Sequence, residues 1–481
     1  MHSTTKSLVR SFLGLLATTA LTATLTVGCG TAPSDDMLDG SGSALSMEVA
    51  DGAVDASVSG PYAAGFTFVR VVDSTRNVDI GGRPVPAYVF YPLDPASVTA
   101  DSPRAMYPMD PLYDTLPKIT SLAYEAAGID PAFENVMPAA EGEFPLAIFS
   151  SGWNFDSSLY IFLGARLATH GIVVAIITHA HDGVLSIPSD PLDSPAASML
   201  HRPQDMSFML TSILAANESD DPFWGGLIDE GAVAAAGHSM GGYAALALAG
   251  GDANVCDSAE YSYGPQPPET CVTISKDKRF HAVISLDGAS YLLSAAELGS
   301  IKVPYISIGE DIAGLDAQGL ESLNGRAHVY AGSRHSYRVD LNHATHESLT
   351  NFCDNIPIWY YNGIMPNANV PADLVQFFYT FYCGVPTGAL NGDSVLPSQV
   401  SYSLVTKYMV AFIKTRLGDE EGYRWMLEPK CGQQQEENID FFVKEAGGDL
   451  HDGPGIYWLP PQWGAEEYDY YGRQTSVACK H

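Results

Sequence analysis

The chain has 481 residues, of which 46% are hydrophobic and 17% charged, so it is long enough and apolar enough to bury a large core. Its formal net charge of −32 at pH 7 argues against nucleic acid as a partner, because phosphates would be repelled. The same charge disfavours anionic membrane surfaces, unless something other than charge holds the chain there.

Residues 1–28 have the pattern of a secretory signal peptide. Lys6 and Arg10 precede the apolar run SFLGLLATTALTATLTVG, and polar, Gly-rich sequence follows at once, so the run does not predict a membrane span. The end of the run, LTVGC, resembles the lipobox of bacterial lipoproteins and implies lipidation of Cys29. A plain secretory signal cut near Gly28 is the alternative. We therefore expect an exported protein that is lipid-anchored in a bacterial cell envelope or secreted.

Residues 29–60 are expected to form a flexible acidic tether. They are rich in Ser, Gly, Ala and Asp and contain no aromatic residue, so they cannot bury enough surface to fold.

The cysteines predict disulfides. Six remain after Cys29, and an even number in an exported chain favours disulfide pairing. Cys256 and Cys271 are a plausible pair because they would close a short loop. The pairing of the others stays open, and these are Cys353, Cys383, Cys431 and Cys479.

From residue 61 to residue 420, short apolar runs alternate with longer amphipathic ones. Strands are predicted at FTFVRVVD, VPAYVFYP, PLAIFSSG, IVVAIITHA, AVAAAGHS, HAVISLDG and PYISIGED. Helices are predicted at LYIFLGARLATHG, at DMSFMLTSILAAN, after Ser239 and over Ser403–Gly418. Almost wholly apolar strands that alternate with helices predict an α/β fold, with a mostly parallel central sheet and helices on both faces.

The stretch VAAAGHSMGGYAALALAG places Ser239 at a strand-to-helix turn with glycine nearby on both sides. In a nucleophile elbow the serine has a strained backbone, and the residues two before and two after it must lack bulk. Gly237 and Gly241 meet this demand, and Gly242 and Ala244 let the helix pack closely. The pattern predicts a nucleophilic serine if an acid and a histidine follow in that order.

Both groups follow. Asp287 ends one predicted strand and Asp311 ends the next, so either carboxylate would emerge at the carboxyl edge of the sheet and could hold a histidine tautomer. His343 and His346 come later, in VDLNHATHESLTNF, after a final strand-like run. We expect one of these histidines to be the base and the other to be a hydrogen-bonded loop residue.

Several segments, in consistent order and spacing over residues 62–355, resemble the plasma-type platelet-activating-factor acetylhydrolases and their bacterial dienelactone-hydrolase-like relatives. The segments are VVDSTRNVDIGGRPVPAYVFYP, FPLAIFSSGWNFDSSLYIFLGARLATHGIVVAIITHAHDG, LHRPQDMSFMLTSIL, RFHAVISLDGAS and VDLNHATHESLTNF. The resemblance implies an α/β-hydrolase fold and a serine esterase activity.

Carried over to this chain, the resemblance implies Ser239 as nucleophile, Asp287 as acid and His346 as base. It also implies that the backbone N–H groups of Trp153 and Met240 form the oxyanion hole.

Two positions depart from the pattern or compete with it. The family usually has His-Gly where this chain has Ser151-Gly152, so the oxyanion loop differs in sequence. Asp311 matches the place where dienelactone and polyester hydrolases carry their acid and stays the alternative to Asp287. His343 stands where the family tends to have a small residue, which favours His346.

This mechanism requires no metal or organic cofactor, and we expect none. His179, His181 and Asp182 in THAHDG could bind zinc together with His343 and His346. A full ligand pattern such as HExxH is absent from the sequence, so lining of the pocket is the better interpretation of THAHDG.

Two segments lie outside this core pattern. The insert over residues 94–143 is rich in Met, Tyr, Leu and Phe, and it serves either substrate access or core packing. Residues 421–481 are expected to be a disulfide-held extension that packs on a catalytic domain of residues 61–420.

The sequence as a whole predicts a serine carboxylic-ester hydrolase. Short-acyl or phospholipid-type esters are favoured by the resemblance, and a dienelactone or polyester-type activity is the alternative. An inactive binding lipoprotein is the contrasting hypothesis. The expected partner is a small-molecule or lipid ester, not nucleic acid.

Overall fold

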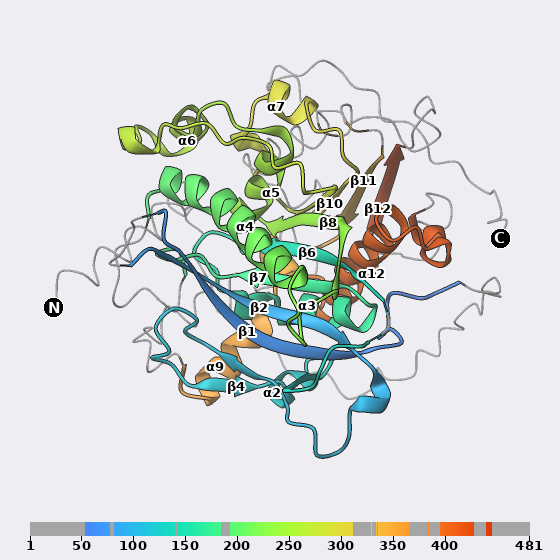
Figure 1. Cartoon of the computed structure of the whole chain (residues 1–481). Coiled ribbons are helices and arrows are strands. Elements are labelled where there is room, and N and C mark those ends of the chain that lie inside the picture. The colour runs from blue at the N-terminus through green and yellow to red at the C-terminus, as the bar shows by residue number, and fades with distance from the viewer. Residues whose placement is uncertain are drawn as a thin grey trace, which may run out of the picture. The chain divides into compact units, whose positions relative to one another are not determined.

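A computed structural model describes the middle of the chain. The described residues are 53–76, 81–140, 142–183, 193–310, 335–364, 395–427 and 439–444, with Val329, Ser333 and Cys383. Within them, ten strands form one sheet in the order β12-β11-β10-β9-β8-β6-β7-β2-β1-β5. Figure 1 shows the central strands of this sheet with helices around them. The strands are β1 (Ala63–Asp73), β2 (Arg83–Leu93), β5 (Ala132–Glu134), β6 (Phe144–Ser150), β7 (Val173–Ile177), β8 (Ile228–His238), β9 (Ala282–Leu286), β10 (Tyr305–Glu310), β11 (Ser336–Leu341) and β12 (Ile439–Lys444).

The strand directions define the fold. The six strands from β6 to β11 run parallel to one another, and β2 runs antiparallel to both β1 and β7. β12 adds antiparallel to β11, and the short β5 adds parallel to β1. This order and these directions are those of the α/β-hydrolase fold, so the expected fold class is confirmed. A separate pair is formed by β3 (Met106–Pro108) and β4 (Lys118–Thr120).

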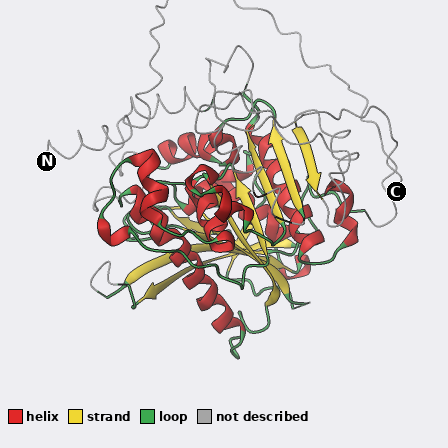
Figure 2. Ribbon diagram, turned by 90° about the horizontal axis from the view of Figure 1, so that it is seen from above, coloured by secondary structure: helices red, strands yellow, loops and turns green. Residues whose placement is uncertain are grey.

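Helices cover the sheet on both faces (Figure 2). In β6, Ala147 and Phe149 belong to one core cluster and Leu146 and Ile148 to the other, which is the alternation of a strand buried on both sides. α3 (Ile161–Thr169) and α12 (Ser398–Arg416) belong to the first cluster, and α4 (Pro195–Asn217) and α5 (Met240–Gly250) belong to the second. The other helices are α2 (Leu122–Glu125), α6 (Val255–Tyr263), α7 (Ala295–Gly299) and α9 (Phe352–Tyr361), and the 3₁₀ turns are η1 (Pro95–Ser97), η2 (Ser157–Tyr160), η3 (Pro268–Thr270), η4 (Ser290–Leu292), η6 (His346–Leu349) and η7 (Glu421–Leu427).

The packed chain begins before the expected end of the tether. Ala56 is completely buried, and the N–H of Val54 donates to the carbonyl of Gly422 at 3.0 Å. The indole N–H of Trp425 donates to the carbonyl of Val54 at 3.1 Å. Composition alone misses this packing, because the partners of these residues come from the far end of the chain.

The expected C-terminal extension contributes to the main sheet. β12 pairs in register with β11, from Leu341 opposite Ile439 to Ser336 opposite Lys444. A boundary at residue 420 therefore cuts through the sheet. The signal peptide, Cys29, Cys431 and Cys479 lie outside the described residues.

The described residues contain two disulfides. Cys256 pairs with Cys271, as predicted, and Cys353 pairs with Cys383. Disulfides of this kind fit a chain that folds in an oxidising, exported environment. In the part of the chain that the structure describes, no helix has the length and hydropathy needed to cross a membrane.

The insert over residues 94–143 is used at least partly for core packing. Tyr107 and Tyr124 are buried, and their ring centroids lie 5.8 Å apart. Tyr107 also packs edge-on against Phe66 of β1, with centroids 4.8 Å apart, and stacks on Tyr88 of β2. Tyr107 therefore packs against both strands and against Tyr124.

Candidate active site

Ser239 lies at the turn between β8 and α5, with φ 56° and ψ −120°. This backbone conformation is strained for any residue that has a Cβ, and it persists only where the surroundings fix it. The backbone of Ser239 is fixed at both ends, since its N–H donates to the carbonyl of Leu286 at 3.0 Å and its carbonyl accepts from the N–H of Ala289 at 2.9 Å. Ser239 is partly exposed, although His238 and Met240 on either side are buried.

The positions of the glycines around Ser239 leave no room for a Cβ, because backbone segments approach each other closely there. A Cβ on Gly237 would lie 2.2 Å from the carbonyl oxygen of Gly241, and a Cβ on Gly241 would lie 2.0 Å from the carbonyl oxygen of Ser150. A Cβ on Gly242 would lie 2.5 Å from the Cα of Gly288. The turn therefore packs directly against the end of β6 on one side and the end of β9 on the other.

Asp287 and His346 form a pair at the carboxyl edge of the sheet. Asp287 follows β9 directly, and its N–H donates to the carbonyl of Ile308 at 2.7 Å. Its Oδ2 accepts a hydrogen bond from Nδ1 of His346, which opens the 3₁₀ turn η6. The Asp287 side chain is 5% exposed and that of His346 is 35% exposed, so the acid is buried and the imidazole reaches the surface.

The pair sets the charge of the histidine. Burial lowers the pKa of His346, but the charge of Asp287 and its hydrogen bond outweigh burial and raise the pKa to about 9. The pKa of Glu347, the next residue, is also raised, but here burial of the carboxyl is the cause and the nearby imidazole of His346 opposes it.

Asp311 and His343 are the alternatives to Asp287 as acid and to His346 as base. Asp311 lies outside the described residues. His343 is exposed, has φ 62°, and accepts a hydrogen bond from the N–H of Leu396 at its carbonyl, at 2.9 Å. The contact with Asp287 is thus made by His346.

Glu310, at the end of β10, was not singled out by the sequence. Its carboxylate, that of Asp287 and a ring nitrogen of His346 lie within 4.8 Å of one another, so these three could together hold a cation. The hydrogen bond between Asp287 and His346 already accounts for two of the three. The zinc set weighed from the sequence is different, and its members His179 and Asp182 are engaged by Asp205 and Arg202.

The expected oxyanion loop, residues 150–154, lies against the turn of Ser239, as the close approach of Gly241 shows. Met240 is the first residue of α5, and the first N–H groups of a helix have no acceptor within the helix. Among the described residues, the N–H of Trp153 makes no hydrogen bond. The N–H groups of Trp153 and Met240 stay the expected donors of the oxyanion hole.

His238 links the oxyanion loop to the segment that carries His346. Burial and the charge of His346 hold the pKa of His238 well below its usual value, so its ring is neutral. Nε2 faces the carbonyl of His346 at 3.1 Å and must donate, so Nδ1 accepts from the hydroxyl of Tyr160 at 2.9 Å. Tyr160 in turn accepts from the N–H of Gly152 at 2.8 Å. The three hydrogen bonds thus form one chain, in which Gly152 donates to Tyr160, Tyr160 donates to His238 and His238 donates to the carbonyl of His346.

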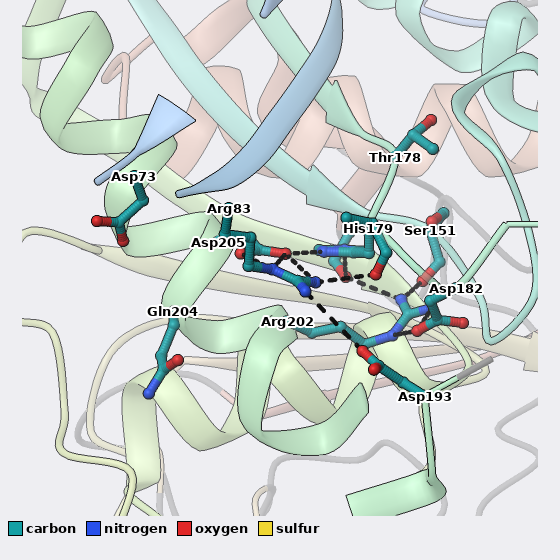
Figure 3. Close-up of polar contacts among 12 residues, drawn as sticks. Asp73, Arg83, Ser151, Thr178, His179, Asp182, Asp193, Arg202, Gln204 and Asp205 are labelled. Carbon is teal, nitrogen blue, oxygen red and sulfur yellow. Dashed lines mark hydrogen bonds and ion pairs between the residues drawn. The ribbon is translucent and has the colours of Figure 1, made fainter. Parts of the chain in front are cut away.

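A second Ser-His-Asp set lies beneath the loop. Ser150 Oγ is 2.8 Å from Nε2 of His179. Figure 3 shows His179 beside Asp205, whose Oδ2 is 2.8 Å from Nδ1 of the ring. All three side chains are completely buried. Burial and the charge of Arg202 lower the pKa of His179 to about 4, and Arg83 binds Asp205 at 2.9 Å. A substrate has no access to Ser150, so this set is structural.

Arg202 of α4 lies between that set and the oxyanion loop (Figure 3). Its Nε and Nη2 are 2.8 and 2.7 Å from Oδ2 of Asp182, and Asp182 Oδ1 accepts from the N–H of Asn154 at 2.8 Å. Sequence reasoning assigned no role to Arg202. In the sequence, Arg202 belongs to LHRPQDMSFMLTSIL, one of the segments that carry the resemblance.

A cavity of about 150 Å³ lies next to the turn that carries His346. Its lining is mixed, with polar and apolar side chains and one disulfide. The lining residues are Glu347, Ser348, Thr350, Cys353, Cys383, Val395, Leu396, Pro397 and Ser398.

Among known proteins, similarity was found only in the comparison with solved structures. No family model and no curated protein matches the chain. Among solved structures, the chain is similar to a ferulic acid esterase from Streptomyces cinnamoneus, with 20% sequence identity and a TM-score of 0.48 over 74% of this chain and 91% of the other. The assignment of the fold rests on the strand order and directions given above.

Proposed function

We propose that this protein is a serine hydrolase of carboxylic esters, with Ser239 as nucleophile, His346 as base and Asp287 as acid. The observation that carries the proposal is the Asp287–His346 hydrogen bond beside the strained turn of Ser239. The turn and the pair share a support, because β9 ends at Leu286, which binds the N–H of Ser239, and Asp287 follows it. An acid and a base held next to a strained serine form a recurrent arrangement in acyl transfer.

The chemistry follows from the hydrogen bonds. Asp287 binds Nδ1 of His346, which leaves Nε2 to take the proton of Ser239 as its oxygen attacks an ester carbonyl. The N–H groups of Trp153 and Met240 then stabilise the negative charge on the carbonyl oxygen, each by about 3–4 kcal/mol. The alcohol leaves with the proton from His346, and water hydrolyses the acyl-enzyme with the same base.

The proposed substrates are short-acyl or phospholipid-type esters. The support is the resemblance to the platelet-activating-factor acetylhydrolases, together with the contact of His346 with Asp287, the residue that this resemblance implies as the acid. A dienelactone or polyester-type hydrolase, with Asp311 as acid, is the second candidate. Attachment to a membrane through a lipid on Cys29 is part of the proposal.

The test of the proposed function is hydrolysis of a p-nitrophenyl ester series, from acetate to dodecanoate, by the purified protein. Ser239→Ala and Asp287→Asn should lose activity, while Asp311→Asn should keep it. Loss in Asp311→Asn with an active Asp287→Asn would move the acid to the dienelactone-type position. A folded wild-type protein that cleaves none of the esters would favour the inactive binding lipoprotein.

A further inference from the structure

The backbone of the oxyanion loop is held from beneath by one side chain. Arg202 Nη2 donates to the carbonyl of Gly152 at 2.8 Å, and Nη1 donates to the carbonyl of Ser151 and, at 3.3 Å, to Oγ of Ser150. Arg202 is completely buried, and all three of its nitrogens have partners. The guanidinium therefore draws two successive carbonyls toward the protein interior.

This contact fixes the direction of the next N–H group. The peptide bond between Gly152 and Trp153 is planar and trans, so its C=O and N–H point in opposite directions. Because the carbonyl of Gly152 points at Arg202, the N–H of Trp153 points away from Arg202. The neighbouring N–H groups have other partners, since Gly152 donates to Tyr160 and Asn154 donates to Asp182.

We propose that Arg202 is a positioning residue that sets the oxyanion hole by holding the carbonyls of Ser151 and Gly152 inward. The proposal rests on the proposed function, because it concerns the donor that meets the charge of the ester oxygen. Asp182 holds Arg202 through two nitrogens and ties down Asn154 with its other oxygen. The loop is thus clamped on both sides of Trp153.

Lysine cannot replace arginine in this role. The guanidinium is a planar fork, and here it serves a carboxylate and two carbonyls at once. An ammonium keeps the positive charge beside Asp182 but carries its donors on one nitrogen. Arg202→Lys therefore keeps the charge of the site and loses the fork that fixes the loop.

The first experiment compares Arg202→Lys with wild type in kcat, KM and inhibitor affinity. An aryl trifluoromethyl ketone adds reversibly to the nucleophile and forms an oxyanion, whereas the matching alcohol only occupies the site. We expect kcat for p-nitrophenyl acetate and affinity for the ketone each to fall about 100-fold, with KM and alcohol affinity changed less than about threefold. Circular dichroism and thermal melting report on folding.

Arg166→Lys is the matched control. Arg166 also binds a carboxylate and a main-chain carbonyl, those of Asp130 and Ser57, away from residues 150–154. Its variant should keep kcat and ketone affinity. The inference is overturned if Arg202→Lys also keeps kcat and ketone affinity. It is overturned as well if KM rises and alcohol affinity falls by as large a factor as kcat falls.

A second measurement needs no variant. In a crystal structure of the wild-type protein carrying a phosphonate on Ser239, a phosphonyl oxygen should accept from the N–H groups of Trp153 and Met240, with Gly152 still bound to Arg202. An oxygen that avoids the N–H of Trp153 contradicts the inference even if Arg202→Lys fails to fold. Wild type that takes up no phosphonate and hydrolyses no ester instead contradicts the proposed function.

Discussion

Backbone strain at the level of single residues is concentrated around Ser239. Five of the eight non-glycine residues with positive φ among the described residues belong to the loops discussed above. Asp, Asn and His tolerate this region better than other residues, whereas Ser239, with ψ −120°, lies outside the usual left-handed well. The five residues are Asn154, His181, Ser239, Asp287 and His343.

The raised pKa of His346 leads to a pH dependence. The ring must be neutral to accept the proton of Ser239, and Asp287 outweighs the effect of burial to raise its pKa to about 9. We therefore expect kcat/KM of the wild type to rise with pH through about 9 and to fall at lower pH, as the imidazole becomes protonated. A pH profile of p-nitrophenyl acetate hydrolysis, corrected for the uncatalysed reaction, measures this.

Asp287→Asn tests the cause of that profile. Without the carboxylate, the pH at which kcat/KM rises should fall from about 9 to about 6.5 or below. The value of kcat should fall by about 10⁴-fold, because the histidine tautomer is no longer held. If kcat/KM of Asp287→Asn rises at the same pH as that of the wild type, a group other than His346 titrates in the profile.

At the level of elements, most of the sheet could be predicted. The strands β1, β2, β6, β7, β9 and β10 and the helices α3, α4, α5 and α12 overlap the runs singled out in the sequence, because each has a long apolar stretch. β8 is a poor strand by propensity, since four of the five residues in its apolar run, 232–236, are alanine. It was identified from the turn that follows it, and its burial between β6 and β9 overrides alanine's preference for helix.

Other parts of the candidate site could not be predicted. The pairing of His346 with Asp287 depends on which strand ends lie side by side, and the sequence left Asp311 and His343 open as competitors. Arg202 and Tyr160 are typical residues of amphipathic helices and turns, and only the fold brings them under the oxyanion loop. Their function comes from hydrogen bonds to main-chain atoms, which leave almost no pattern in the sequence.

Gly241→Ala tests the close contact between α5 and β6. The added Cβ would meet the carbonyl of Ser150 at 2.0 Å, so the oxyanion loop must move. We expect a loss of about 1–3 kcal/mol in the free energy of unfolding and a fall in kcat of at least about tenfold. Chemical denaturation and ester hydrolysis measure the two effects.

Gly299→Ala, in α7, is the matched control, because nothing lies within 4 Å of the added Cβ. It should leave activity unchanged and the stability equal or slightly higher. Equal losses in both variants would mean that the contact of Gly241 with Ser150 is not the cause.

At the level of the whole molecule, the ends of the described chain complete the structure. Val54 binds the 3₁₀ turn η7, and β12 extends the sheet beyond β11. Composition identified residues 29–60 as a tether and residues 421–481 as an extension, because local sequence carries no information on contacts between such distant segments.

The two disulfides should differ in their effect on activity. Cys353 lies at the start of α9, seven residues after His346, and lines the cavity beside His346 together with Cys383. Cys256 and Cys271 instead close a loop at α6. Cys353→Ser with Cys383→Ser should lose about 3–4 kcal/mol of stability and most of kcat. Cys256→Ser with Cys271→Ser should lose about 3 kcal/mol and keep kcat in the folded protein.

Denaturant titration measures the loss of stability. A kcat measured at denaturant concentrations well below the unfolding transition measures the activity of the folded protein, so the two effects are separated. If both double variants lose the same share of kcat, the link between Cys353 and Cys383 does not specifically support His346.

Mass spectrometry after treatment with a fluorophosphonate tests the central claim most directly. The expected result is one adduct on the wild-type protein, on the peptide that contains Ser239, with no adduct in Ser239→Ala and a much slower reaction in Asp287→Asn. An adduct on Ser150, or on any serine of the folded Ser239→Ala protein, would contradict the assignment. So would a folded wild-type protein that forms no adduct.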